Sequence, residues 1–292
     1  MKKKVKDSIY GKLSKFIKVK YMPEYVIGIA ILNIFISLIL IFLIDLRNIY
    51  GLRDVLFDLN PYYFFFEYQP FVFYHWYRNG GVAELFQWVF LGGASIIAAI
   101  LAGRLLNRDK KALLFWLIMS VVFILMLIED AGDPRHTIRS YVQAVYSEAG
   151  QGIMGSITEL FYFSILGFIP LYGYLKYGAV LRKNFKSWFY FIIGFISYFV
   201  ATFLSFIGSA VDFYNYIGRI LYEWLLEIGD SLLVFQWQAF EAEEGWEFIS
   251  FFLMDSLFEE AIELIGAASF FAAAISYLLF ELYSQNENQI KK

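Results

Sequence analysis

The sequence contains no cysteine, only five prolines and only two histidines in 292 residues. Without cysteine the chain can form no disulfide, and thiolate metal sites and cysteine nucleophiles are excluded. A phosphate-binding glycine loop and an HExxH zinc motif are also missing, and neither Ser209 nor Ser256 has a base arranged for nucleophilic catalysis. The sequence therefore gives no signal for a nucleotide, a haem or a serine hydrolase, and we expect no nucleic-acid partner.

Charged residues are scarce as well, at 17% of the chain, whereas 60% of the residues are hydrophobic and 21% are aromatic. Soluble domains contain about 45–50% apolar residues. Together with a mean hydropathy of +0.57, this composition indicates an integral membrane protein. The net charge of −3 carries little information because the charges are segregated along the chain.

Six stretches are apolar enough to cross a bilayer, which requires about 20 residues in a helix. They are Tyr25–Ile44, Leu85–Leu105, Ala112–Ile128, Ile153–Tyr174, Trp188–Val211 and Ile249–Tyr283. We therefore predict an all-α bundle of about six transmembrane helices in one domain, residues 25–283. A basic segment, residues 1–24, precedes it and a short tail, residues 284–292, follows. The first apolar run is long enough to span and has no cleavage site after it, so we do not expect a signal peptide.

Basic residues mark alternate loops of this predicted topology. Eight lysines fall between Lys2 and Lys20, and further basic residues follow the second, fourth and sixth spans. These are Arg104, Arg108, Lys110 and Lys111, then Lys176, Arg182, Lys183 and Lys186, and finally Lys291 and Lys292. Lysine and arginine accumulate in cytoplasmic loops. The pattern predicts a protein of the cell membrane with both termini in the cytoplasm.

Two of the predicted outer loops have an unusual composition. Between Tyr62 and Tyr77, eleven of sixteen residues are aromatic, which is typical of a helix or belt at headgroup level. The loop from Asp212 to Glu247 is rich in acids, and its middle, Tyr216–Trp237, alternates apolar and acidic residues at helical spacing. We expect interfacial helices on the outer side, the second of which would cover the outer face as a lid.

The start of the last span carries an unusual density of carboxylates. At 100° per residue, Asp255, Glu259 and Glu263 fall within an arc of about 100°, with Glu260 at its edge. Charged residues at the centre of a bilayer cost roughly 2.5–3.5 kcal/mol each on insertion scales, so they are rare and usually functional. The pattern predicts a polar face turned toward the interior of the bundle.

Acids of other spans lie toward the same predicted outer end. The third span ends in Glu129 and Asp130, the fourth carries Glu159 and the fifth ends at Asp212. Arg135, His136 and Arg139 follow the third span, and the two arginines would offset part of the negative charge. Because acids outnumber bases, some carboxylates must be protonated, solvated or bound to a cation. Carboxylate oxygens suit Ca²⁺, Mg²⁺ or Mn²⁺, and an imidazole would admit Zn²⁺ or Fe²⁺.

Three of these elements together resemble a loose set of prokaryotic polytopic membrane proteins of uncharacterised function. The elements are Glu129-Asp130 followed by His136, an acid at Asp212 after Gly208, and the pattern Glu259-Glu260-x-x-Glu263-x-x-Gly266. The acidic pair reads Glu-Asp here where Asp-Glu is usual, and threonine rather than glutamate follows the histidine. The resemblance covers roughly residues 128–283 and implies a shared site without implying an activity.

The sequence leaves three functions open. The first is a membrane protein that binds a cation, either a divalent metal or a proton, in transport, gating or sensing. Its site would be Glu159, Glu259, Glu260 and Glu263, completed by Asp255, Glu129, Asp130, Asp212 and His136. The second is a metal-dependent enzyme acting on a lipid or lipid-linked substrate. The third is a non-catalytic subunit of a membrane complex or a homo-oligomer. All three predict the lipid bilayer as a partner.

Overall fold

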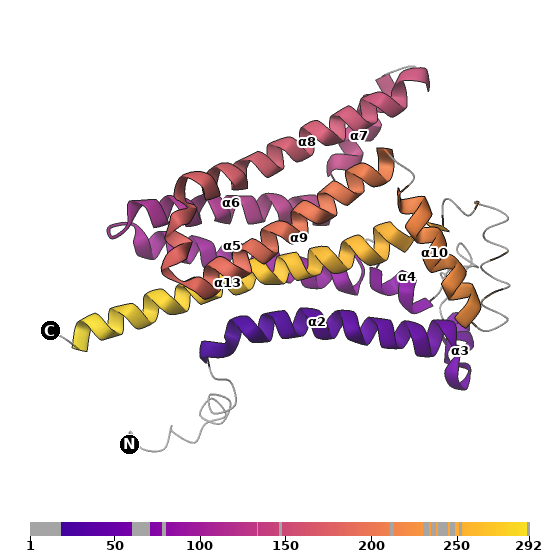
Figure 1. The fold of residues 1–292 in the computed structure, drawn as a ribbon, viewed down its shortest axis with the longest axis horizontal. Coiled ribbons are helices and arrows are strands. Elements are labelled where there is room, and N and C mark those ends of the chain that lie inside the picture. Colours follow the sequence, from indigo (N-terminus) through magenta and orange to yellow (C-terminus); the bar gives the residue numbers. More distant parts are fainter. Residues whose placement is uncertain are drawn as a thin grey trace.

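The computed structural model of the chain is a bundle of long helices (Figure 1). The structure describes residues 19–59, 71–77, 80–132, 134–145, 148–210, 213–229, 249–250 and 253–290, together with residues 234, 238 and 245. The regular elements in these ranges are all helices, joined by short turns, and no strand occurs among them. The predicted all-α fold class is confirmed.

Six helical stretches are long and apolar enough to cross a membrane, which is the number that the sequence predicts. They are Val19–Leu46, His75–Leu105, Lys110–Gly132, Leu160–Lys183, Phe185–Leu204 and Leu257–Ser284. Their principal helices are α2 (Met22–Leu40), α5 (Val82–Leu105), α6 (Lys110–Gly132), α8 (Glu148–Tyr177), α9 (Phe185–Ala210) and α13 (Glu260–Ile290). The outward faces of these helices are apolar, for example at Ile29, Leu32 and Phe35 of α2, so a lipid bilayer is their natural environment.

The two ends of the bundle differ in structure and in charge. Four shorter helices gather at the end where α5 and α13 begin, namely α3 (Leu52–Leu59), α4 (Phe71–Tyr77), α7 (Pro134–Val145) and α10 (Phe213–Ile228) (Figure 1). We call it the acidic end, because Glu129, Asp130, Glu260 and Glu263 lie there. The opposite end holds the start of α2, the end of α13 and the α5–α6 turn. We call it the basic end, after its exposed Arg104, Lys110, Lys183 and Lys186.

Helix α13 is the centre of the bundle and packs against α9, α5 and α2. In its most apolar 18-residue window 67% is buried inside the protein, compared with 17% for the first span. Small residues at Ala267, Ala268, Ala272, Ala273 and Ala274 are all buried, and they let neighbouring helices approach closely. Burial in protein rather than lipid explains how this helix tolerates several carboxylates at its start.

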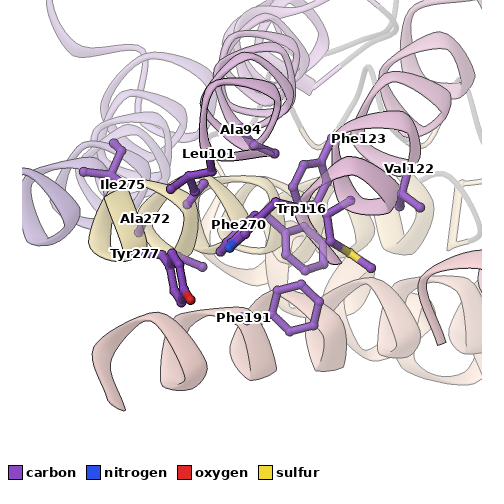
Figure 2. Packing of buried hydrophobic residues seen from close by; sticks show 14 of the residues in the cluster. Ala94, Leu101, Trp116, Val122, Phe123, Phe191, Phe270, Ala272, Ile275 and Tyr277 are labelled. Carbon is purple, nitrogen blue, oxygen red and sulfur yellow. The ribbon is translucent and has the colours of Figure 1, made fainter. Parts of the chain in front are cut away.

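A block of aromatic rings fills the middle of the bundle (Figure 2). We call it the aromatic block; it consists of Phe115, Trp116, Phe123, Phe191, Phe270 and Tyr277. The ring centroid of Phe270 lies 5.0 Å from that of Phe123 and 5.4 Å from that of Phe191. Gly194 of α9 gives the Phe270 ring its space, because an added Cβ would come within 2.7 Å of it. Nearer the basic end, Trp116 packs on Tyr277 at 5.2 Å.

In the described part of the aromatic loop, one side of α4 packs into the protein. Val72, Phe73 and Tyr77 of α4 are buried in a second apolar cluster. Buried Asp45, in the π-helix η2 (Ile41–Leu46), accepts hydrogen bonds from the backbone N–H groups of Val72 at 3.0 Å and Phe73 at 2.8 Å. These bonds satisfy the first turn of α4 and fix it to the first span. Residues 62–70 of the predicted belt lie outside the described residues.

Two ion pairs join neighbouring elements at the basic end. Lys183 donates to Asp109 at 2.6 Å, and Lys186 donates to Glu24 at 2.5 Å. Asp109 also caps α6, because its Oδ1 accepts from the backbone N–H groups of Lys111 and Ala112. The Lys183 ammonium and these N–H groups hold the pKa of Asp109 below its ordinary value.

A candidate carboxylate site at the acidic end

Carboxylates from three parts of the chain meet at the acidic end. Asp130, at the end of α6, lies within electrostatic range of Glu263 on α13, Glu84 on α5 and its neighbour Glu129. Glu259, the last residue of the π-helix η6 (Leu253–Glu259), lies within electrostatic range of Glu263. Arg135 of α7 acts on both Asp130 and Glu259 with the opposite charge. Of the acids named from the sequence, Glu129, Asp130, Glu259 and Glu263 thus share one neighbourhood.

Glu84 belongs to this site although sequence reasoning passed over it. It lies in the first turn of α5, where it is buried and accepts a hydrogen bond from the backbone N–H of Gly80. The predicted span began at Leu85, so Glu84 counted as a loop residue. The available signal was an acid directly beside a span boundary at the same end as Glu129 and Asp130.

Arg135 and Tyr162 hold Glu129. The Arg135 Nε lies 3.5 Å from the Glu129 Oε1, and the Tyr162 hydroxyl donates to Oε2 at 2.5 Å. The guanidinium of Arg135 also lies 4.8 Å from the centroid of the Phe163 ring, a cation–π arrangement. Glu129 therefore ties α6 to α7 and α8, and Arg135 supplies positive charge beside the acids.

Glu259 and Glu260 are adjacent in sequence but accept hydrogen bonds from two different helices. The hydroxyl of Tyr214, on α10, donates to Glu259. The side-chain amide of Gln87, on α5, donates to the Glu260 carboxylate at 2.9 Å and to the Glu260 carbonyl at 3.1 Å. The sequence predicted a regular α-helix here, whereas η6 is a π-helix that gives way to α13 at Glu260. The extra residue per turn changes which side chains share a face, and such bulges are frequent at functional sites.

Tyr198 of α9 is the least expected member of the site. Its hydroxyl lies within electrostatic range of Asp130, Glu263 and Glu260, is buried, and has no hydrogen-bond partner among the described residues. The Oδ2 atom of Asp130 is buried and unpartnered in the same sense. A buried hydroxyl and a buried carboxylate oxygen without partners are costly, at about 1–3 kcal/mol each. A ligand that hydrogen-bonds to both would remove that cost.

Several predicted site residues cannot be placed at the side-chain level. Glu159 lies on α8, His136 on α7 and Asp255 in η6, but the structure describes their backbone only. Asp212 lies outside the described residues. Arg139 lies on α7, two residues beyond Thr137, and is half-buried. The predicted roles of these five residues stay predictions.

The described residues do not form a metal site. No group of three or more His, Asp or Glu side chains within the described ranges is arranged to hold a metal ion. Four of the acids accept hydrogen bonds from protein donors, Glu84 from Gly80, Glu129 from Tyr162, Glu259 from Tyr214 and Glu260 from Gln87.

No family model, no curated protein and no solved structure matches this chain. The resemblance to prokaryotic polytopic membrane proteins therefore stays a prediction, and the function has to be argued from the site itself.

Proposed function

We propose that this chain is a multi-pass protein of the cell membrane that senses acidity on the outer side by binding protons at its carboxylate cluster. The observation that carries the proposal is the buried hydroxyl of Tyr198, which lies within electrostatic range of Asp130, Glu263 and Glu260 and has no hydrogen-bond partner in the described part of the chain. The positive-inside rule assigns the basic end to the cytoplasm and the acidic end to the outside.

The balance of charge favours a bound cation. Asp130 interacts with three other carboxylates and with one guanidinium, that of Arg135. Like charges at short range in a poorly solvated site repel strongly, and carboxylates in such a site share protons. A proton satisfies two requirements at once, because it removes a negative charge and turns a carboxylate into a hydrogen-bond donor. It also needs no displacement of Gln87 or Tyr214 from the neighbouring acids.

The aromatic block favours sensing over transport through the bundle. Tyr198 stacks on Phe270 at 5.7 Å, and Phe270 packs in turn on Phe123 and Phe191. From Glu263 toward the basic end, the central helix α13 thus meets apolar rings before it reaches Tyr277. The buried serines beside this layer bond locally, Ser95 to Ser120 and Ser187 to the carbonyl of Ala273, and among the described residues these bonds do not reach the carboxylate cluster.

Infrared difference spectroscopy tests the proposal directly. The purified protein in lipid nanodiscs is taken from alkaline to acidic buffer, and the carbonyl stretch of protonated carboxylic acids is recorded. We expect a band in the wild type that Asp130→Asn and Glu263→Gln each reduce. Glu223→Gln is the matched control, because this exposed acid of α10 pairs with Arg219 away from the cluster. If Asp130→Asn and Glu263→Gln both show a band as strong as that of the wild type, the proposal is contradicted.

Elemental analysis separates protons from metals. We expect the wild-type protein to carry no stoichiometric divalent metal. Stoichiometric metal in the wild type that is lost in Glu259→Gln and Glu263→Gln would overturn proton sensing and support the metal-dependent alternatives.

A further inference from the structure

Helix α10 has two different apolar faces. At about 100° per residue, the exposed side chains of Phe213, Tyr216, Ile220 and Trp224 fall within an arc of about 80°. We call this the aromatic face. Tyr214, Gly218 and Tyr222 are buried and lie about 160° away around the helix. A helix that needed only to cover the bundle would be polar on its outward side.

The buried face fixes α10 to the carboxylate site. Gly218 packs against the backbone of Ser250, so closely that a Cβ at this position would overlap the Ser250 carbonyl. Tyr214 donates its hydroxyl hydrogen bond to Glu259. The position of α10 therefore decides whether the Tyr214 hydroxyl reaches the cluster.

The aromatic face continues a surface that already faces lipid. Helix α9 leads into α10, and its exposed Phe199 and Phe203 belong to the apolar exterior of a membrane-spanning stretch. The aromatic face itself contains tyrosine and tryptophan, the residues that accumulate at the boundary between headgroups and hydrocarbon. On its edge, exposed Arg219 and Glu223 form an ion pair at 2.8 Å. Exposed Glu227, near the C-terminal end of α10, falls within the same arc, so the stripe is apolar from Phe213 to Trp224 and ends at a carboxylate. An apolar aromatic stripe with charged ends and edges is typical of a helix that lies in the membrane interface.

We infer that the partner of the aromatic face is the outer headgroup layer of the bilayer, and that this lipid contact keeps Tyr214 against Glu259. The depth of α10 in the membrane does not depend on the proposed proton binding. The influence of lipid on the carboxylate cluster rests on the proposed function. The two parts therefore have separate tests.

The depth of α10 can be measured with spin labels, because the chain has no cysteine of its own. Single-cysteine variants Ile220→Cys and Glu223→Cys are labelled with a nitroxide and reconstituted in nanodiscs. Relaxation by oxygen, which partitions into lipid, is compared with relaxation by a water-soluble nickel chelate. We expect the label at 220 to favour oxygen, as a label at Leu32 of α2 does, and the label at 223 to favour the chelate.

Two outcomes would overturn the membrane contact. If the label at 220 meets the chelate as readily as the label at 223, the aromatic face lies in water. If it meets neither reagent, protein rather than lipid covers the face.

The coupling is tested by moving the aromatic face out of the interface. Ile220→Asp adds one negative charge to this face, whereas Glu223→Gln removes one negative charge from its polar border. We expect Ile220→Asp to shift the pH midpoint of the infrared carboxyl band in the same direction as Tyr214→Phe, and Glu223→Gln to leave the midpoint within error. An unchanged midpoint in Ile220→Asp, with a shift in Tyr214→Phe, would overturn the coupling alone. If the wild type shows no carboxyl band, the proposed function is wrong. The spin-label experiment still decides whether the aromatic face contacts the membrane.

Discussion

The ring of Tyr198 occupies the space that a side chain at position 266 would need. A Cβ added to Gly266 would come within 2.8 Å of the Cδ2 of Tyr198 and within 3.1 Å of the Cβ of Ser197. The glycine that ends the pattern Glu259-Glu260-x-x-Glu263-x-x-Gly266 thus lets α9 approach α13, and it sets the position from which the Tyr198 hydroxyl reaches the acids. This relationship gives a structural role to a residue that carries no chemistry of its own.

Gly266→Ala is expected to lower stability by about 1–3 kcal/mol, because the tightly packed Tyr198 ring would have to move. Thermal unfolding in detergent micelles measures the effect. Gly28→Ala on α2 and Gly167→Ala on α8 are matched controls, since nothing lies within 4 Å of an added Cβ at either position. Alanine favours helix over glycine by about 1 kcal/mol, so the controls should unfold no earlier than the wild type. If Gly266→Ala behaves like the two controls, the packing argument is wrong.

Gly218→Ala should be more damaging than Gly266→Ala. At position 218 the obstacle is the backbone of Ser250, which cannot rotate away as a ring can. We expect a loss at the upper end of about 1–3 kcal/mol, together with separation of α10 from η6. Limited proteolysis of α10 at the melting midpoint of each variant reports the separation. Equal protection of α10 in Gly218→Ala and in wild type would contradict this reading.

The hydrogen bond that Gln87 donates to Glu260 is expected to contribute more to stability than the charge of Glu260 does. Gln87→Leu leaves the Glu260 carboxylate without this donor and should lower stability by about 1–3 kcal/mol. Glu260→Gln keeps an oxygen that can accept from the Gln87 amide, so its loss should be smaller. The double variant measures the coupling between the two side chains, and additive losses would show that they do not interact.

The ionisation of Asp109, at the basic end, should make the stability of the protein depend on pH. Its pKa is lowered in the folded protein by the Lys183 hydrogen bond and by the N–H groups of α6. The ionised form is therefore favoured by folding. The stabilisation is complete above the ordinary aspartate pKa of about 3.9 and is lost as the pH falls through the lower folded value.

Asp109→Asn keeps the helix cap and removes the ion pair, so its loss at pH 7 should be about 0.2–1 kcal/mol. Asp109→Ala removes the cap as well and should lose about 1 kcal/mol more. The difference between wild type and Asp109→Asn should shrink in acid. A difference that grows as the pH falls would contradict the sign of this linkage.

The all-helical fold and the number of candidate spans followed from composition and spacing, because apolar runs are local properties of a sequence. Residues 253–259 show where that reasoning stops. Their spacing fits an α-helical face, but packing against α10, with Gly218 on Ser250, accompanies a π-helix instead. Helical spacing in the sequence carries no information about a tertiary contact of this kind.

The contribution of Tyr198 was equally out of reach. On α9 it is one of many aromatic residues, and only the placement of α13 through Gly266 distinguishes it from its neighbours. Glu84 was within reach, because its type and its place beside a span boundary are visible in the sequence.

The layer of rings around Phe270 separates the acidic end of the bundle from the basic end, so we expect the two ends to respond differently to pH. In sealed vesicles that carry the protein in one orientation, it should respond to acid added on one side of the membrane and not to acid added on the other side. Replacement of Phe270 by alanine would then make the response two-sided before it made the vesicles leak.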